Sequence, residues 1–440
     1  MQPKSTPIPF EIVNRVIKES GLPQVGKASI REVVRLINII EEESGQKFIR
    51  MEMGVPGLPP SQIGVDAEIE AIKKGIGAIY PPVEGIPELK YEASRFIKLF
   101  LDIDIGDAGI IPTVGSMQGG FAAFLMSCRR DAKKDTTLFI DPGFPVQKQQ
   151  HNVLGLKYET FDVYEYRGTK LRNKLESYLF NGNISTILYS NPNNPSWICF
   201  NNDELKIIGE LATKYDIIVI EDLAYFGMDF RQDYSKPGQP PFQPTVAKYT
   251  ENYILLISSS KIFSYAGQRI GIMAIGDKLF NQSFPDLKRF YSSDKFGYST
   301  IYGAVYALSS GTGHSAQYAL AAIFKNVNDG KINFVDGIKE YGERAEKMKK
   351  IFTEKGFKIV YDKDIDKPIA DGFYFTISFP GMTSAELIEE LLYYGISAIS
   401  LDITGSERGD GLRACVSQVQ LQQMPILEDR LKTFAANHSA

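Results

Sequence analysis

The sequence predicts an α/β protein, in which a large domain is built on a mostly parallel sheet covered by helices on both faces, beside a smaller α+β domain. Three observations predict this. Short apolar runs alternate with amphipathic stretches through the middle of the chain, which is typical of a parallel sheet. Polar and small residues follow those runs, where such sheets bind ligands. After about Ser310 a long helical tract precedes shorter strand and helix signals.

The N-terminal part predicts two helices and a loop. The first helix covers about Pro9 to Ser20. The second begins at Ser29-Ile-Arg-Glu32, a capping-box pattern in which each end side chain satisfies a backbone N–H of the first turn. It runs to Glu43, and a Gly/Pro-rich loop follows over 51–60. A further helical stretch ends near Gly75.

The strand signals of the large domain are short runs rich in Ile, Val, Leu and Tyr. Amphipathic stretches such as Asp203–Tyr215 separate most of them. The predicted strands are Gly109–Thr113, Thr137–Ile140, Ile184–Tyr189, Ile217–Ile220 and Tyr253–Ile257.

Each of these runs is followed by a group of polar or small residues. The group after the first run opens a helix, where backbone N–H groups can reach an anion such as phosphate. The five groups are 115–120 (Gly-Ser-Met-Gln-Gly-Gly), 141–144 (Asp-Pro-Gly-Phe), 191–195 (Asn-Pro-Asn-Asn-Pro), 221–225 (Glu-Asp-Leu-Ala-Tyr) and Lys261.

The C-terminal part predicts the smaller domain. A helical tract from about Gly313 to Gly356 carries many lysines and glutamates. Strand, helix, strand and strand signals then precede a last helix from about Gln420. We expect residues 1–60 and 313–440 to form the small domain and 61–312 the large one. The later signals lie at Phe373–Ser378, Ser384–Tyr394, Ile396–Ile399 and Leu412–Val416.

Composition excludes several classes of function. The chain has 440 residues and a formal net charge of -4, which gives no electrostatic case for nucleic acid or an anionic membrane. No apolar run reaches the roughly 20 residues of a membrane helix, and the N-terminus lacks the apolar core of a signal peptide. A cytoplasmic location is therefore expected. Three cysteines and three histidines are scattered along the chain, so no metal site is expected.

Lys261 stands among serines and apolar residues directly after a strand run. A lysine in such company is costly to keep charged, so its amine becomes nucleophilic and able to form a Schiff base. The alternative, a surface charge beside a turn together with Arg269, remains open on this stretch alone.

The five groups in this order resemble the fold-type I pyridoxal-phosphate enzymes, and within them the class I and II aminotransferases. The resemblance covers nearly the whole chain and implies an aspartate-aminotransferase-like fold with pyridoxal 5'-phosphate as cofactor. It implies that Lys261 is the Schiff-base lysine and shuttles a proton, and that Asp222 pairs with the pyridine nitrogen. Tyr225 and Asn194 resemble the residues beside the cofactor's phenolic oxygen.

Further cofactor contacts follow from the same resemblance. Phe144 falls where the family stacks an aromatic ring on the cofactor, although a plain core phenylalanine is possible. Tyr80 resembles the tyrosine that reaches the phosphate of the neighbouring subunit, which implies a homodimer with shared active sites. The expected phosphate ligands within one chain are Ser116, Met117, Ser258 and Arg269.

The resemblance also implies a substrate site. Arg413, in Gly-Leu-Arg-Ala-Cys-Val, resembles the arginine that binds the substrate α-carboxylate in bidentate fashion, with Gly54 and Asn194 nearby. The alternative is a surface arginine paired with Asp410. The family usually has Asn-Pro-Thr-Gly where this chain has Asn-Pro-Ser-Trp197, which puts bulk near the loop and could change the rim of the site or the dimer contact. The stretch 291–313 is not aligned and is expected to hold the side-chain pocket.

Three other readings are weighed against an aminotransferase that acts on an L-amino acid and a 2-oxo acid. A lyase or synthase of the cystathionine-lyase or aminocyclopropane-synthase type would use the same cofactor residues. A serine hydrolase is suggested by Ser258-Ser-Ser-Lys261, which fits S-x-x-K, but the chain lacks Lys-Thr-Gly. A non-enzymatic regulator would need a DNA-binding domain, and the N-terminus is short and not basic.

Overall fold

The computed structural model describes residues 5–438. The contacts within the chain divide it into two compact units. The large unit comprises Leu58–Asn193 and Cys199–Ile338. The small unit comprises the chain up to Gly57, the short segment Asn194–Ile198 and the chain from Lys339 onward.

The large unit ends at Ile338, whereas the sequence predicts its end at residue 312. Helix α13 (His314–Asn328) packs against α3 (Gln62–Lys73) and α4 (Pro87–Leu101) and so belongs to the large unit. The predicted tract 313–356 is two helices, because the chain leaves helical geometry after Asn328 and turns at Gly330, where φ is +70°. Helix α14 (Glu340–Glu354) then begins in the small unit.

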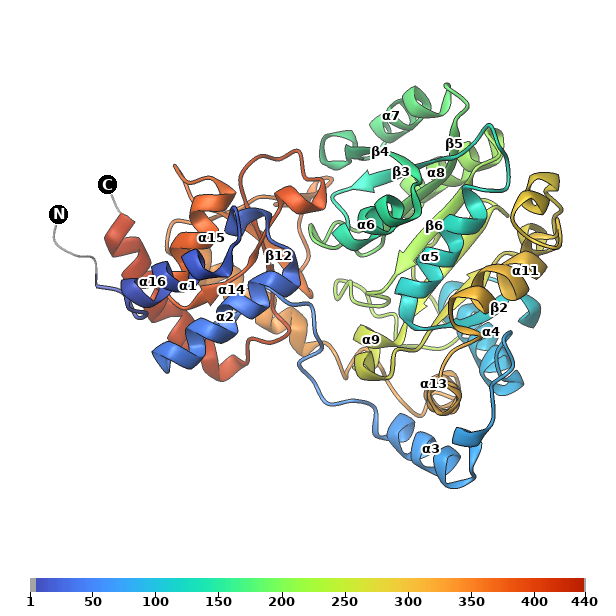
Figure 1. The fold of residues 1–440 in the computed structure, drawn as a ribbon, viewed down its shortest axis with the longest axis horizontal. Helices are drawn as coiled ribbons and strands as arrows, with labels where there is room; N and C mark the ends of the chain where they lie inside the picture. The colour runs from blue at the N-terminus through green and yellow to red at the C-terminus, as the bar shows by residue number, and fades with distance from the viewer. Residues whose placement is uncertain (1–4, 439–440) are drawn as a thin grey trace. The chain divides into compact units, whose positions relative to one another are not determined.

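A seven-stranded sheet forms the centre of the large unit, in the order β2-β8-β7-β6-β5-β3-β4 (Figure 1). Only β8 runs antiparallel to its neighbours, as expected for a mostly parallel sheet. All residues of β5, β6 and β7 are buried, which explains their nearly continuous apolar sequence. The strands are β2 (Ile110–Thr113), β3 (Thr136–Asp141), β4 (Lys157–Asp162), β5 (Ile184–Ser190), β6 (Ile218–Leu223), β7 (Tyr253–Ser258) and β8 (Gly271–Ile275).

Helices cover this sheet. Helix α5 packs on β7 and β8, α6 packs on α5, and α7 packs on α8 (Figure 1). Besides α3, α4 and α13, the large unit has α5 (Gly115–Ser127), α6 (Pro145–Leu154), α7 (Lys170–Leu179), α8 (Asn202–Lys214), α9 (Ser259–Ile262), α10 (Asp277–Asn281), α11 (Phe296–Ser299) and α12 (Tyr306–Ser309). Its short helical turns are η2 (Ile76–Ala78), η3 (Asp107–Gly109), η4 (Tyr164–Tyr166), η5 (Val246–Lys248), η6 (Ala266–Gln268), η7 (Pro285–Arg289) and the π-helix η8 (Thr300–Val305).

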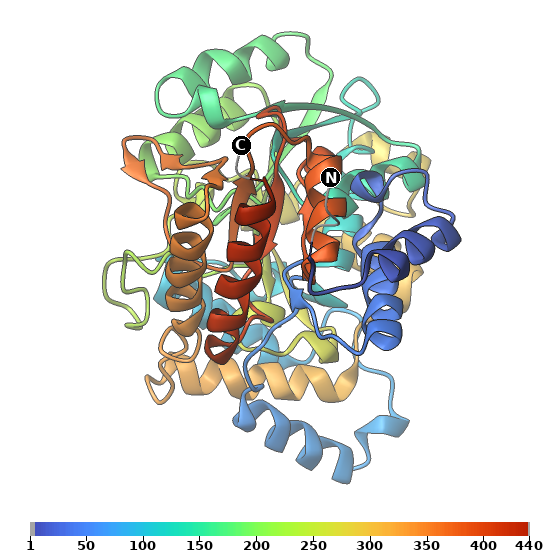
Figure 2. The same cartoon turned by 90° about the vertical axis from the view of Figure 1, so that its left-hand side faces the viewer.

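The small unit combines an antiparallel sheet with helices. Its four strands follow the order β14-β15-β12-β9, and α14 and α16 pack against each other (Figure 2, orange and red). The predicted run 396–399 is two strands, β13 and β14, which join different sheets. The elements are α1 (Phe10–Ser20), η1 (Val25–Lys27), α2 (Ile30–Ser44), β1 (Ile49–Arg50), β9 (Lys358–Ile359), β10 (Lys363–Asp364), β11 (Lys367–Pro368), β12 (Tyr374–Ser378), α15 (Ser384–Tyr393), β13 (Ile396–Ser397), β14 (Ile399–Ser400), η9 (Asp402–Thr404), β15 (Leu412–Cys415), η10 (Leu421–Gln423) and α16 (Met424–His438).

Local sequence signals explain both ends of helix α2. The predicted capping box of α2 is present, because the Ser29 hydroxyl accepts from the Glu32 N–H and the Glu32 carboxylate accepts from the Ser29 N–H. The helix ends at Gly45, whose φ of 68° suits a glycine.

Among residues 5–438, no helix is both long and apolar enough to cross a membrane. The same residues contain no group of His, Cys, Asp and Glu side chains that could hold a metal ion. A cytoplasmic location stays a prediction.

Candidate active site

The polar groups predicted from the sequence follow adjacent strands of the large unit. Ser190 of β5 pairs with Asp222 of β6, and Asp222 pairs with Leu256 of β7. The parallel strands β5, β6 and β7 therefore end at the same edge of the sheet, which is where open α/β sheets bind ligands.

Lys261 lies one turn beyond the end of β7, in the short helix α9, and is half-buried. Two serines fix this turn. The Ser258 hydroxyl accepts a hydrogen bond from the Ser260 N–H at 3.2 Å. The Ser259 hydroxyl donates to the Ile270 carbonyl at 2.6 Å. The backbone that carries Lys261 is thus tied to the residue before β8.

Asp222 is buried near the end of β6, with 6% of its surface exposed. Burial raises the pKa of its carboxyl to about 6, although two donors oppose the rise. The Ala224 N–H donates to one carboxylate oxygen at 3.1 Å, and the Gln147 amide donates to the other at 2.9 Å. The carboxylate is therefore held in one orientation.

Gln147 is a residue that the sequence reasoning missed. It lies in the first turn of α6, three positions after Phe144, and is 7% exposed. Its place in the helix that follows β3 was available as a signal, but nothing in its local sequence indicates that its amide meets Asp222.

Phe144 and Tyr225 follow β3 and β6. Phe144 is the residue before α6 and is half-buried. Tyr225 lies in the turn after β6 and is 5% exposed. Both thus occupy loops at the edge of the sheet near which Asp222 lies.

An anion cradle is formed where α5 begins. Ser116 and Met117 lie in its first turn, and no side chain caps this end of the helix. Gly115 has φ +64°, and a Cβ placed on it would lie 2.7 Å from an Nη atom of Arg269. A Cβ on Gly271 would lie 3.2 Å from the Ser116 nitrogen. The helix N-terminus, an adjacent guanidinium and two glycines that leave room together suit a phosphate.

Tyr80 is not brought to these residues within one chain. It lies in the loop between η2 and α4, and 90% of its surface is exposed. Ile79 beside it is 60% exposed and Ile72 of α3 is 55% exposed. The large unit therefore exposes Tyr80 together with the adjacent Ile79.

The predicted substrate residues lie in the small unit. Arg413 of β15 is 1% exposed. One Nη atom donates to the Asn194 side-chain oxygen at 3.3 Å, and the other donates to the Glu52 carbonyl at 2.5 Å. The guanidinium also lies over the Tyr374 ring, 4.6 Å from its centroid. Gly54 adjoins the same ring, since a Cβ on it would lie 2.0 Å from the Tyr374 hydroxyl.

Neither acidic residue near Arg413 neutralises it. The Glu52 carboxylate is bound to Arg50 at 2.7 Å and to Ser397 at 2.5 Å. Asp410, the alternative partner, accepts from the Ser384 N–H instead. Within residues 5–438, no carboxylate forms an ion pair with the Arg413 guanidinium.

The unaligned stretch 291–313 contains α11, η8 and α12. Three tyrosines spaced four residues apart, Tyr298, Tyr302 and Tyr306, are about half exposed along it. Its role in a side-chain pocket stays a prediction.

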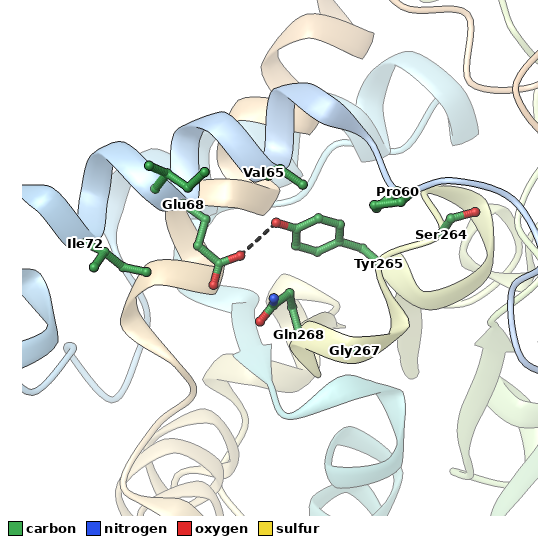
Figure 3. Close-up of a pocket in the computed structure, with 9 residues that line it drawn as sticks. Pro60, Val65, Glu68, Ile72, Ser264, Tyr265, Gly267 and Gln268 are labelled. Carbon is green, nitrogen blue, oxygen red and sulfur yellow. Dashed lines mark hydrogen bonds between the residues drawn. The ribbon is translucent and has the colours of Figure 1, made fainter.

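A cavity of about 400 Å³ lies between α3 and the loop that follows α9 (Figure 3). The Tyr265 hydroxyl points to Glu68 and donates to it at 2.7 Å, and Ser315 donates to the other carboxylate oxygen at 3.0 Å. Apolar side chains of α3, among them Val65 and Ile72, form its other wall. None of the predicted site residues lines this cavity.

The structure is similar to solved aminotransferases. It matches the alanine aminotransferase from Pyrococcus furiosus with a TM-score of 0.75 and 19% identity, over 94% of this chain and 98% of that one. It matches the aspartate aminotransferase from Thermus thermophilus, solved with maleate, with a TM-score of 0.73 and 15% identity, over 96% and 98%. The predicted fold class is confirmed.

Two sequence relatives are similar over most of their length. A probable aspartate aminotransferase of Methanocaldococcus jannaschii is 24% identical over 355 residues, which is 76% of this chain and 88% of that protein. The LL-diaminopimelate aminotransferase of Natranaerobius thermophilus is 23% identical over 397 residues, 89% and 91% respectively. The family model described as aminotransferase class I and II matches residues 47–431. The chain therefore belongs to the class I and II aminotransferases, enzymes that use pyridoxal 5'-phosphate.

Proposed function

We propose that the chain transfers an amino group between an L-amino acid and a 2-oxo acid, with Lys261 as the residue that anchors the cofactor and moves the proton. The proposal that the substrates are carboxylic acids rests on the environment of Arg413. It is a buried guanidinium whose hydrogen-bond partners are both uncharged oxygens. A carboxylate is the partner that such a group lacks.

The residues of the large unit fit the cofactor. The start of α5, with Ser116 and Met117, and the neighbouring Arg269 would hold its phosphate, with Ser258 as a further ligand. Asp222, a buried acid whose charge needs a cationic partner, would hold its pyridine nitrogen.

The ring contacts complete this set. Phe144 would stack on the ring, and Tyr225 would donate to its phenolic oxygen. Asn194, which binds Arg413 in the small unit, would take part in binding the same oxygen and the substrate.

When bound, pyridoxal 5'-phosphate supplies a ring that withdraws the electron pair released at the substrate α-carbon. The protein contributes the groups around it. Asp222, when ionised, keeps a proton on the pyridine nitrogen. The Lys261 amine would hold the cofactor covalently, and the freed amine would be the base that takes up and gives back the proton of the substrate α-carbon. Arg413 orients the α-carboxylate, which all amino-acid substrates share.

Arg413→Lys tests the proposal. Lysine keeps the charge but cannot reproduce the two parallel hydrogen bonds, so kcat/KM should fall by an amount that corresponds to about 3 kcal/mol or more, similarly for every donor and acceptor. The visible absorbance of the resting enzyme should not change. Because the relatives are named as aminotransferases of aspartate, alanine and LL-diaminopimelate, the donor panel should contain all three.

Arg430→Lys is the matched control. Arg430 is also a buried arginine of the small unit, 7% exposed, and its guanidinium binds two backbone carbonyls. It should alter stability without altering kcat/KM in the same uniform way. A loss in Arg413→Lys that is confined to dicarboxylic substrates would make Arg413 a side-chain ligand instead. Elimination products in place of a new amino acid would favour a lyase.

A homodimer with shared sites is the proposed assembly. The exposure of Tyr80 and of the adjacent Ile79 supports this, because neighbouring large apolar side chains left in water are typical of interaction surfaces. In this assembly Tyr80 would reach the phosphate bound by the partner.

A further inference from the structure

Trp197 has a backbone conformation that is unusual for a large side chain. It is the only tryptophan of the chain, it is fully buried, and its φ is +64°. A bulky side chain rarely adopts this left-handed conformation, so the surrounding contacts must hold it there. Because it is buried, Trp197 does not lie on an exposed rim of the site.

The contacts that hold the indole come from Gly372, two residues before β12, and from Tyr374, its first residue. A Cβ placed on Gly372 would lie 2.0 Å from Cε2 of the indole, so the ring occupies the space that a side chain at Gly372 would fill. The indole also meets the Tyr374 ring edge-to-face, with 6.2 Å between the centroids and 65° between the planes. Trp197 is thus seated on Gly372 and against Tyr374.

Tyr374 connects the indole to Arg413. The Arg413 guanidinium lies over the Tyr374 ring at 4.6 Å, and β12 pairs with β15, with Tyr374 opposite Cys415. A cation over an aromatic face is attracted by the ring, so the position of the ring influences that of the guanidinium.

The backbone provides a second connection. Asn194 lies three residues before Trp197, and its side-chain oxygen accepts from Arg413. The five-residue segment Asn194–Ile198 groups with the small unit although the residues on either side of it belong to the large unit. Trp197 is the largest side chain that attaches this segment to the small unit.

We infer that Trp197 is a positioning residue for carboxylate binding. Its indole attaches the segment Asn194–Ile198 to β12, and through Tyr374 and Asn194 it fixes the orientation of the Arg413 guanidinium. The inference rests on the proposed role of Arg413, which it extends to a residue that does not contact the substrate.

Gly372→Ala is the sharpest test, because the backbone at Gly372 is not in the left-handed region while the added methyl would collide with the indole. The holoenzyme should bind monocarboxylates without an amino group, from acetate to hexanoate, about 10- to 100-fold more weakly in calorimetry. Emission from Trp197, the only tryptophan, should shift as the indole is displaced. Gly337→Ala is the control, since its Cβ would make only an ordinary contact at 3.4 Å.

Two further variants make the result decisive. Trp197→Gly removes the indole and suits the positive φ, and it should weaken carboxylate binding to a similar degree while KM rises more than kcat falls. Trp197→Phe combined with Gly372→Ala gives the methyl room, so this double variant should bind more tightly than Gly372→Ala alone.

Three results would overturn the inference. One is a folded Trp197→Gly enzyme that binds the monocarboxylates like the wild type. If that variant does not fold, unchanged binding by Gly372→Ala is the second. The third concerns the double variant Trp197→Phe/Gly372→Ala. Its loss of carboxylate affinity would overturn the inference if it equalled the sum of the losses in Trp197→Phe and in Gly372→Ala. Arg413→Lys distinguishes a failure of the Trp197 inference from a failure of the proposed function. If that variant bound monocarboxylates like the wild type, Arg413 would not be the carboxylate ligand, whatever the Trp197 variants do.

Discussion

Replacement of Gln147 by leucine should move the titration of Asp222. The Gln147 amide donates to the buried carboxylate at 2.9 Å. A hydrogen bond to a charged group contributes about 1.5–3 kcal/mol, and one pKa unit corresponds to about 1.4 kcal/mol. Loss of this donor should therefore raise the pKa of Asp222 from about 6 by roughly one to two units, to near or above neutrality.

The sign of the effect on stability follows from linkage. Burial raises the pKa of Asp222 in the folded protein to about 6, above its ordinary value of 3.8. The folded state then binds more protons than the unfolded state between these values, so this group destabilises the protein as the pH rises through them. In Gln147→Leu the same decline should continue to higher pH, and the difference from the wild type should grow to about 1.5–3 kcal/mol once Asp222 is ionised.

The assay is the pH dependence of the free energy of unfolding of the cofactor-free protein. Asp141 and Glu221 are also buried carboxyls, and burial raises the pKa of each to about 7, so absolute curves mix several groups. The comparison should therefore be repeated in an Asp222→Asn background, where the effect of Gln147→Leu should no longer depend on pH. A pH-dependent effect of Gln147→Leu that survives in the Asp222→Asn background would refute the reasoning. So would the lack of a pH-dependent effect when Asp222 is present.

Lys261→Ala should fold normally but lose the visible absorbance of the covalently held cofactor and nearly all turnover; persistence of that absorbance would place the anchor at another residue. Arg269→Leu removes the charge beside the first turn of α5 and should weaken cofactor binding, measured by titration of the cofactor-free protein, by about 2 kcal/mol or more; equal affinity would exclude Arg269 as a phosphate ligand. Mixing Tyr80→Phe with Lys261→Ala subunits should raise activity well above either parent, because one site of each mixed dimer is intact; proven subunit exchange without a rise would assign Tyr80 to its own subunit's site.

The sheet and its ligand-binding edge were predictable because both depend on local sequence. Buried parallel strands require continuous apolar runs, and the residues after them must lie at one edge of the sheet. Strand β4 was missed because it is an edge strand with the polar residues Lys157 and Glu159 and incomplete burial. The break between α13 and α14 was missed because the charged residues around Gly330, such as Lys325, Asp329 and Lys331, fit a continuous exposed helix as well as a turn.

The contacts of the site were predictable only where a resemblance supplied them. The pattern that contains Arg413 was recognisable, whereas the meeting of Gln147 with Asp222 joins residues far apart in the chain. The seat of Trp197 on Gly372 is likewise a tertiary contact without a local signal. In each case the partner is chosen by packing between elements, which neither propensity nor periodicity encodes.

The placement of Asn194–Ile198 has a consequence for folding during synthesis. The large unit encloses this segment in sequence, yet the residues that bury Trp197 are made only when the ribosome reaches Gly372 and Tyr374. Until then the nascent chain exposes its largest aromatic side chain in the loop between strand β5 and helix α8. Contacts of such long range form late and leave apolar surface open to chaperones and to aggregation. A fragment that ends at Ile338 would keep this exposure permanently.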